Sequence, residues 1–262
     1  MPTHELFSMD HEVVIVTGAA GGLGSELARI LAAANATVVL VDIDEKALAE
    51  LCHELTSQGL SAIAKVCDIT HAQAIETLVE DVDAEYQRID ALVNCAGILG
   101  SNEYMFNIEP DEWDAVMNIN LKATWQMSTC IASYMLGKKI HGRIVNISSS
   151  LGGRAQLKRI HYATSKAGVE HLTRNMAMEL VKKNIRVNCL APGWLATPMV
   201  KDILDGPEGK HWRKTIPMGR AADPQELTGA LLLLASRASS YMTGSVLRVD
   251  GGYSYRGIEF DF

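Results

Sequence analysis

Short apolar runs alternate with segments of helical periodicity along the whole chain of 262 residues. The runs are rich in Val, Ile, Leu and Ala and are too short for helices, so they are typical of strands buried on both faces of a sheet. Strands separated by helix-length segments predict a parallel sheet with right-handed crossovers. The seven predicted strands cover residues 13–16, 38–41, 62–67, 91–93, 144–147, 185–190 and 246–249.

Helical signals fill the intervals between these strands. Ile75, Leu78 and Val79 begin an i, i+3, i+4 pattern that defines one apolar face. Asp44 is placed to cap a helix, and Pro110 is placed to begin one. The predicted helices cover residues 23–34, 45–58, 75–86, 110–136, 162–183 and 224–236. The expected fold is therefore α/β, a Rossmann-type doubly wound parallel sheet of about seven strands with helices on both faces, in a single domain over residues 1–262.

Composition limits the partners and the location of the protein. Lys and Arg number 24 against 31 Asp and Glu, and this net charge of −7 disfavours binding to nucleic acid or to an anionic membrane. No apolar run approaches the roughly 20 residues of a membrane helix, and the first residues lack the pattern of a secretory signal. The five cysteines form no C-x-x-C pair and read as reduced, buried side chains. We expect a cytoplasmic protein that binds a small molecule.

A glycine-rich turn, TGAAGGLG over residues 17–24, joins the first predicted strand to the first predicted helix. Such a turn lets a ligand approach the backbone, and the helix start offers unpaired N–H groups to phosphates. Asp42 ends the second strand, where a carboxylate accepts the hydroxyls of an adenosine ribose and repels a 2′-phosphate. The pattern predicts a dinucleotide site that prefers NAD(H) to NADP(H). Its expected residues are Gly18, Gly21, Gly22, Leu23, Gly24 and Asp42.

Tyr162 and Lys166 lie four residues apart in a predicted helix and therefore on one face of it. A nearby ammonium favours phenolate and lowers the pKa of tyrosine from its reference value of about 10, which improves proton transfer near neutral pH. Serines 148–150 follow the fifth predicted strand, and ligands bind at the carboxyl ends of parallel strands. A serine there can donate to a carbonyl oxygen where negative charge develops. No G-x-S-x-G elbow surrounds it, so a nucleophilic role is not expected.

In this order, the motifs resemble those of the short-chain dehydrogenase/reductase family, in its compact single-domain branch, over about residues 8–254. The resemblance implies an oxidoreductase that interconverts a secondary alcohol and a ketone with a nicotinamide cofactor. In this family the serine lies thirteen residues before the tyrosine, which selects Ser149. Asn120 matches the second asparagine of a helix motif and is implied to hold a water linked to Lys166. A buried asparagine that satisfies backbone groups is the alternative. The implied catalytic residues are Asn120, Ser149, Tyr162 and Lys166, of which Tyr162 and Lys166 also contact the cofactor.

Three further segments resemble cofactor-binding motifs of the family. Residues 68–69 match the adenine-binding pair, and residues 94–97 match the motif NNAG except at Cys95. Residues 192–197, PGWLAT, match the segment that lies along the nicotinamide. The resemblance implies that the Leu195 backbone meets the carboxamide and that the Thr197 hydroxyl meets the carboxamide or the pyrophosphate. The implied residues are Asp68, Ile69, Asn94, Ala96, Gly97, Pro192, Gly193, Leu195 and Thr197.

The substrate is less closely defined. Residues 194–222 form a long irregular stretch, which we expect to be a substrate lid. Four basic side chains lie between the predicted serine and tyrosine, namely Arg154, Lys158, Arg159 and His161. They favour a polar or acidic substrate, although a solvated loop would carry the same residues. The chain resembles gluconate 5-dehydrogenases and almost equally 3-oxoacyl carrier-protein reductases. Asp42 weighs against the second, because these enzymes more often use NADP.

Two predicted helices, 110–136 and 162–183, are apolar around more than one face and should be buried on more than one side. Family members pair these helices across a dimer axis, so the resemblance implies a homo-oligomer, and we expect a homotetramer. A non-catalytic dinucleotide-sensing protein is an alternative class, but such members usually lose the tyrosine or lysine that this chain keeps. The eight histidines show no metal-ligand spacing, so no metal site is expected.

Overall fold

The computed structural model describes residues 3–197, 205–207 and 209–255. Its seven strands form one sheet in the order β3-β2-β1-β4-β5-β6-β7, and all neighbouring strands are parallel. The predicted fold class is therefore confirmed. The strands are β1 (Val13–Thr17), β2 (Thr37–Asp42), β3 (Ala62–Val66), β4 (Ala91–Asn94), β5 (Arg143–Ile147), β6 (Arg186–Pro192) and β7 (Val246–Val249).

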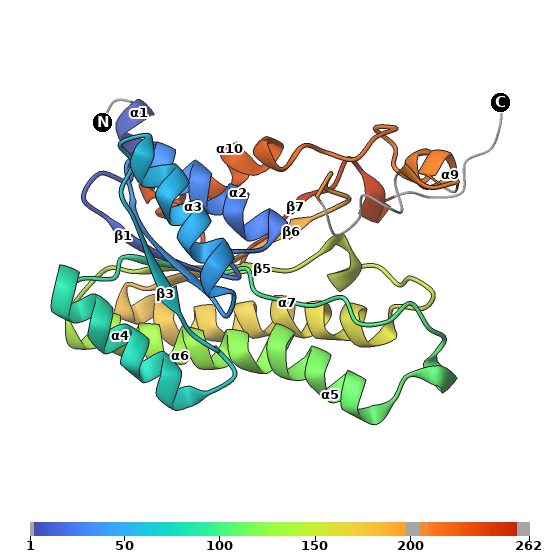
Figure 1. Cartoon of the computed structure of the whole chain (residues 1–262), viewed down its shortest axis with the longest axis horizontal. Coiled ribbons are helices and arrows are strands. Elements are labelled where there is room, and N and C mark those ends of the chain that lie inside the picture. The colour runs from blue at the N-terminus through green and yellow to red at the C-terminus, as the bar shows by residue number, and fades with distance from the viewer. Residues whose placement is uncertain (1–2, 198–204, 208, 256–262) are drawn as a thin grey trace.

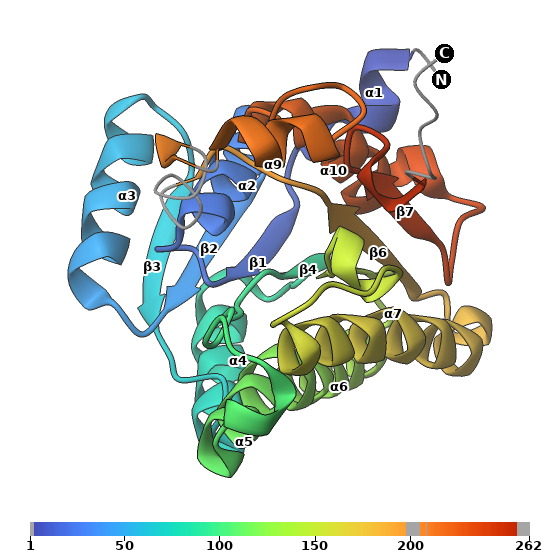
Figure 2. The same cartoon turned by 90° about the vertical axis from the view of Figure 1, so that its right-hand side faces the viewer.

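Helices cover both faces of the sheet, with α2, α3 and α10 on one face and α4, α6 and α7 on the other (Figures 1 and 2). Helix α5 packs beside α7. The α-helices are α1 (Thr3–Phe7), α2 (Gly22–Ala33), α3 (Glu45–Ser57), α4 (Ala72–Tyr86), α5 (Pro110–Met117), α6 (Ala123–Gly137), α7 (Ile160–Leu180), α9 (Gly209–Thr215) and α10 (Thr228–Ala235). No helix in the described ranges has the length and hydropathy needed to cross a bilayer.

Strand side chains alternate between two hydrophobic cores. In β1, Val14 and Val16 pack with α2, α3 and α10, whereas Val13 and Ile15 pack with α4, α6 and α7. All five residues of β1 are buried, so neither face of this central strand meets water. Double coverage explains why the run of apolar residues in β1 is continuous rather than alternating.

The strand order reverses beside β1, which has β2 on one side and β4 on the other. The loops that follow β1 and β4 consequently leave the sheet side by side at its carboxyl edge. Such a reversal opens the crevice in which α/β proteins bind ligands. The fold thus brings the glycine turn after β1 next to residues 95–97 after β4.

The predicted helix over 110–136 is wrong as a single helix. A π-helical turn, η2 (Asn118–Lys122), separates α5 from α6 and contains the buried Asn120. Such turns occur mostly as local interruptions of α-helices, frequently at functional sites. The predicted helix over 224–236 similarly begins as a 3-10 turn, η5 (Pro224–Leu227), in which Asp223 and Glu226 form a capping box. Part of the predicted lid, residues 198–204 and 208, lies outside the described residues.

Candidate active site

A cavity of about 1120 Å³ opens at the carboxyl edge of the sheet. It is larger than the 300–1000 Å³ of a typical small-molecule site. Most of the predicted site residues line it: Gly18, Gly21, Gly22, Leu23, Gly24, Asp42, Asp68, Ile69, Ala96, Gly97, Ser149, Tyr162, Lys166, Pro192, Gly193, Leu195 and Thr197. Asn94 and Asn120 are predicted site residues that do not line it.

The glycine turn has a backbone that tolerates no side chain at two positions. Gly18 has a φ of +67°, and a Cβ on it would lie 2.7 Å from the Cα of Ala96. A Cβ on Gly24 would overlap the carbonyl oxygen of Gly18. Helix α2 then begins without a side-chain cap and without an acidic residue in its first turn. Its first N–H groups are therefore available to an anion such as a pyrophosphate.

Asp42 is bound to the glycine turn at the end of β2. Its Oδ2 accepts a hydrogen bond from the backbone N–H of Ala20 at 3.0 Å, and its Oδ1 accepts one from Ile43 at 2.7 Å. These bonds fix the carboxylate at one end of the cavity. The described basic residues that line the cavity are Arg154, Lys158, Arg159 and Lys166. Arg154, Lys158 and Arg159 lie in the loop before α7 and Lys166 lies in α7, and none of the four lies in the turn or next to Asp42 in sequence.

Asp68 follows β3 and also lines the cavity. Its Oδ1 accepts hydrogen bonds from the hydroxyl of Thr70 at 2.7 Å and from the backbone N–H of Thr70 at 2.9 Å. The hydroxyl bond is the largest cause that lowers the pKa of Asp68 below its usual range. A second carboxylate is therefore held ionised at the same end of the cavity as Asp42, while the neighbouring Ile69 is buried.

Thr17, at the end of β1, binds the loop after β4. Its Oγ1 accepts hydrogen bonds from the backbone N–H groups of Cys95 at 3.1 Å and Ala96 at 3.2 Å. This positioning role was not predicted, although a threonine ending a buried apolar strand is a signal for it. The side chain of Asn94 instead donates to Ser128 at 2.9 Å and to Asn146 at 2.8 Å, away from the cavity. Only the backbone of Asn94 is left to serve a cofactor.

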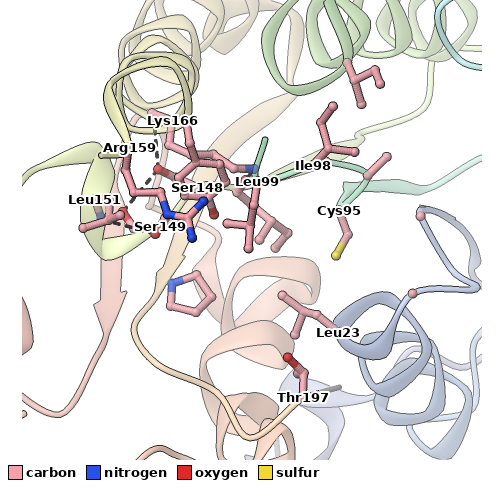
Figure 3. Close-up of a pocket in the computed structure, with 18 of the residues that line it drawn as sticks. Leu23, Cys95, Ile98, Leu99, Ser148, Ser149, Leu151, Arg159, Lys166 and Thr197 are labelled. Carbon is pink, nitrogen blue, oxygen red and sulfur yellow. Dashed lines mark hydrogen bonds between the residues drawn. The ribbon is translucent and has the colours of Figure 1, made fainter. Parts of the chain in front are cut away.

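Ser149 and Lys166 come together at the other end of the cavity (Figure 3). Ser149 begins the 3-10 turn η3 (Ser150–Gly152), and its hydroxyl oxygen accepts a bond from the backbone N–H of Leu151 at 3.2 Å. Tyr162 lies in the first turn of α7, and its phenol is hydrogen-bonded to Ser149. The Lys166 Nζ donates to the carbonyl oxygen of Ile147 at 3.0 Å. Two hydroxyls and one ammonium thus line the same part of the cavity.

The predicted effect of Lys166 on Tyr162 is not seen in this structure. Burial raises the pKa of Tyr162 above its usual range, and the hydrogen bond from Ser149 and the charge of Arg159 oppose it. Burial also lowers the pKa of Lys166. The Lys166 Nζ lies 5.8 Å from the centroid of the Tyr162 ring and is directed at Ile147 rather than at the phenol oxygen. Desolvation, which favours the neutral form of both groups, therefore dominates the pair.

Asn120 uses its side chain to join three segments. Its Oδ1 accepts from the backbone N–H of Ile98 at 2.8 Å, and its Nδ2 donates to the carbonyl oxygen of Ile98 at 2.9 Å and to Ser165 at 3.0 Å. The amide therefore satisfies backbone groups, as the alternative interpretation of this residue expected. It also lies close to the cavity wall, because a Cβ on Gly97 would be 3.1 Å from its Oδ1 and 3.3 Å from the Nζ of Lys166.

The four basic residues before Tyr162 have different surroundings. The guanidinium of Arg154 lies 4.2 Å from the centroid of the Tyr253 ring, and the Nζ of Lys158 lies 4.8 Å from that of Tyr104. His161 is fully buried, and its Nε2 lies 3.3 Å from Glu112. Arg159 reaches toward Ser149, with its guanidinium beside the serine in Figure 3.

An aromatic wall closes the same end of the cavity. The ring centroids of Trp194 and Trp212 are 5.0 Å apart, and those of Trp194 and Tyr253 are 6.3 Å apart. Trp212 comes from α9, inside the predicted lid. The two ends of the lid are joined where Leu195 and Ala222 form a bridge, with Ala196 N–H bonded to the Ala222 carbonyl at 2.8 Å. Sequence patterns gave no signal for the partnership with Tyr253, which is distant along the chain.

Comparisons with known proteins agree with this geometry. A family model described as enoyl-(acyl carrier protein) reductase matches residues 18–254. A 3-oxoacyl-(acyl-carrier-protein) reductase of Thermotoga maritima is 37% identical over 244 residues, which cover 93% of this chain and 98% of that protein. A 5-keto-D-gluconate 5-reductase of Escherichia coli K12 is 35% identical over 251 residues, which cover 95% and 98%.

The fold has equally close counterparts among solved structures. A gluconate 5-dehydrogenase from Burkholderia cenocepacia J2315, in complex with NADP and tartrate, superposes with a TM-score of 0.93 at 32% identity, covering 98% of this chain and 100% of that one. The family model, the relatives and this structure all span nearly the whole chain, so the resemblance predicted from the motifs is confirmed. The protein belongs to the short-chain dehydrogenase/reductase family.

Proposed function

We propose that the protein is an NAD(H)-dependent oxidoreductase that interconverts a secondary alcohol and a ketone. The observation that carries this proposal is the arrangement of the cavity. Ser149, Tyr162 and Lys166 line one end, and the uncapped start of α2 with the glycine turn lines the other. A dinucleotide bound along the carboxyl edge of the sheet would bring its two ends to these two groups of residues.

The glycine turn, Asp68, Ile69 and the segment 192–197 would hold the cofactor, which supplies the hydride acceptor or donor when bound. A Cβ on Gly193 would lie 2.6 Å from the Cα of Asp250, so the cavity wall has no room for a side chain at this position either. Asp42 favours NAD(H), because a fixed carboxylate accepts ribose hydroxyls and repels a 2′-phosphate. The relative from Burkholderia cenocepacia was solved with NADP. The choice of NAD(H) for this chain therefore rests on Asp42.

The residues at the other end of the cavity are proposed to transfer the proton, to bind the substrate oxygen and to position the groups that do so. In oxidation, Tyr162 as phenolate takes the proton of the substrate hydroxyl, and in reduction it returns that proton. Ser149 donates a hydrogen bond to the same oxygen, which gains negative charge as its proton leaves. Lys166 would hold the ribose of a bound cofactor, and it would favour phenolate at Tyr162 only if its ammonium, directed at Ile147 in this structure, turned toward the phenol oxygen. Asn120 keeps the segment 97–98 and α7 in register beside Lys166, in addition to the role in water binding that its motif implies.

The substrate is proposed to be a small polar alcohol or ketone, such as a sugar acid, a polyol or a hydroxyacyl compound. The cationic residues at the reacting end support an acidic or polar molecule. The relative named 5-keto-D-gluconate 5-reductase supports the same class. Reduction of a 3-oxoacyl thioester is the second candidate, favoured by the relative from Thermotoga maritima and by the aromatic wall of Trp194 and Trp212.

One cytoplasmic domain that assembles into a homotetramer completes the proposal. Trp125 and Met178, on α6 and α7, are exposed large apolar side chains that a second copy would cover. A partner on this face would explain why both helices are apolar around more than one side. Analytical ultracentrifugation that finds only a 28.5 kDa species would contradict the assembly.

A turnover assay tests the activity. The purified protein is incubated with NAD⁺ and a panel of polyols, sugar acids and hydroxyacyl thioesters, and with NADH and the matching ketones. We expect a change in NADH absorbance with wild type and a loss of about 10²–10⁴-fold in Tyr162→Phe. NADH binding without turnover of any compound would favour a dinucleotide sensor. Equal or tighter binding of NADPH than of NADH would contradict the argument from Asp42.

A further inference from the structure

Charge is distributed unevenly along the described walls of the cavity. Of the two carboxylates that line it, Asp42 ends β2 and Asp68 follows β3. Of the four cations that line it, Arg154, Lys158 and Arg159 lie in the loop between η3 and α7, and Lys166 lies in α7. The protein as a whole carries a net charge of −7, so this concentration of positive charge is local. An anion entering the cavity is attracted to the end at which Ser149 and Tyr162 lie.

Each of the four cations has contacts within the described part of the protein, and these contacts differ. Arg154 donates to the carbonyl oxygen of Tyr253 and stacks on its ring. Lys158 lies over the ring of Tyr104. Lys166 donates to Ile147 and is assigned to the cofactor by the proposed function. Arg159 differs from Arg154 and Lys158 in its position, because its guanidinium lies beside Ser149 (Figure 3) and its charge acts on Tyr162.

Arg159 is oriented by hydrogen bonds to the turn at residues 100–101, which other side chains hold in place. Its Nη1 donates to the carbonyl oxygens of Gly100 at 3.2 Å and Ser101 at 3.1 Å. Glu112 holds that turn by accepting hydrogen bonds from the backbone N–H and the hydroxyl of Ser101. The Nε2 of His161 lies within hydrogen-bond distance of the same Glu112 carboxylate. These contacts fix one edge of the guanidinium.

Among the described residues, Nε and Nη2 of Arg159 have no hydrogen-bond partner. No described carboxylate lies within ion-pair distance of the guanidinium. Arg159 is also partly buried, which lowers its pKa by desolvation. A partly desolvated guanidinium with free donors matches the planar, two-point geometry of a carboxylate.

The position of Arg159 limits where that carboxylate can be on the substrate. Its guanidinium lies beside Ser149 (Figure 3), and its charge acts on the phenol of Tyr162. Ser149 and Tyr162 are the groups that the proposed function places on the reacting oxygen. An anion bound to Arg159 is consequently close to the reacting carbon rather than at the far end of a long chain.

Resting on the proposed function, we infer that Arg159 is a specificity-determining residue that binds a substrate carboxylate one or two carbons from the reacting carbon. The substrates are then 2- or 3-hydroxy acids and the corresponding keto acids. A neutral alcohol leaves the guanidinium unpaired, and a thioester offers it no charge. The aromatic wall of Trp194 and Trp212 covers the remainder of such a molecule.

Two measurements test this inference with wild type, Arg159→Gln, Arg159→Lys and the control Lys182→Gln. Lys182 is an exposed residue after α7, and its replacement also removes one positive charge. The first measurement is malonate binding, followed by intrinsic tryptophan fluorescence, because two of the four tryptophans, Trp194 and Trp212, line the cavity. Malonate carries carboxylates but no hydroxyl, so its binding is independent of turnover. The second is kcat/KM for 3-hydroxybutyrate, lactate and tartrate against their amides, each with NAD⁺.

We expect Arg159→Gln to weaken malonate binding by about 30-fold or more and to bring the acid-to-amide ratio of kcat/KM near one. Arg159→Lys should keep part of the malonate affinity and part of the preference for acids over amides, and Lys182→Gln should match wild type in both measurements. Unchanged malonate binding in Arg159→Gln, or equal turnover of acids and amides by wild type, overturns the inference. NADH binding checks that Arg159→Gln is folded. If Arg159→Gln does not bind NADH, the test rests on Arg159→Lys. Malonate binding by Arg159→Lys as tight as that of wild type would contradict two-point recognition. No turnover of any compound would contradict the proposed function, while the malonate titration still tests the anion site.

Discussion

Replacement of Gly24 by alanine tests whether the shape of the glycine turn controls cofactor binding. A Cβ at this position would overlap the carbonyl oxygen of Gly18 and would lie 2.7 Å from the Gly18 carbonyl carbon and 3.1 Å from the Cα of Ala19. These neighbours are backbone atoms, so no side chain can rotate away. Because ordinary contact begins near 3.4 Å and the carbonyl oxygen of Gly18 is the nearest atom, the turn must open by more than about 1 Å.

The magnitude follows from this displacement. Forcing an extra methyl into a packed site costs about 1–3 kcal/mol, and a chain of this size loses roughly 2–4 °C in Tm per kcal/mol. We therefore expect the Tm of Gly24→Ala to fall by about 2–12 °C. A misplacement approaching 1 Å between cofactor and substrate costs on the order of 100-fold in rate. NADH binding should weaken and kcat/KM should fall by about that factor.

The matched control is Gly229→Ala, which makes the same substitution near the start of α10. A Cβ on Gly229 has no heavy atom within 4 Å, and the residue is exposed. Alanine is favoured over glycine in a helix by about 0.5–1 kcal/mol, so this variant should be more stable than wild type. NADH fluorescence titration and thermal unfolding of both variants provide the comparison. If Gly24→Ala binds NADH and unfolds as wild type does, the argument from the turn is refuted.

Three other predictions concern the reacting end, the cofactor preference and the core. Burial raises the pKa of Tyr162, and oxidation needs its phenolate, so kcat/KM for oxidation should rise from pH 6 to 10. Over the same range kcat/KM for reduction, which needs the protonated phenol, should not rise. An oxidation rate independent of pH would contradict this. Asp42→Asn keeps an acceptor for Ala20 but removes the charge, so the ratio of kcat/KM for NADP⁺ to that for NAD⁺ should rise at least about tenfold; an unchanged ratio would oppose it. Arg143→Met removes the buried ion-pair partner of Glu12 and leaves it only the exposed Arg237 at 4.0 Å, so the free energy of unfolding should fall by about 3–5 kcal/mol in a denaturant titration; a wild-type midpoint would show that the buried pair contributes nothing.

The sheet was predictable because local patterns determine each strand. Short, mostly apolar runs predicted all seven strands to within one or two residues, and coverage by helices on both faces explains why the runs of central strands such as β1 do not alternate. The strand order was not predicted, since it depends on contacts between segments far apart in the sequence. The π turn around Asn120 was missed for a related reason. Its geometry is supported by bonds to Ile98 and Ser165, which no periodicity reveals.

The candidate site was predictable to the extent that it depends on spacing. Tyr162 and Lys166 lie on one face of α7, and the glycine turn lies between a strand and a helix, as expected. Side-chain directions were less accessible. Asn94 faces Ser128 rather than the cavity, and the ammonium of Lys166 is directed at a backbone carbonyl. Both outcomes depend on which buried polar groups find partners in three dimensions, a choice that sequence spacing leaves open.

The bridge between Leu195 and Ala222 separates the segment that we expect to contact the substrate from the strand ends that we expect to hold the dinucleotide. The bridge joins the chain soon after the end of β6 to the segment that precedes η5, so we expect insertions or exchanges between Leu195 and Ala222 to leave the strand ends undisturbed. A protein built in this way can acquire a new molecular preference by rewriting a single excursion while its nucleotide platform is inherited unchanged. Grafting the excursion of a relative between these two residues is accordingly a compact route to redesigning what the enzyme accepts.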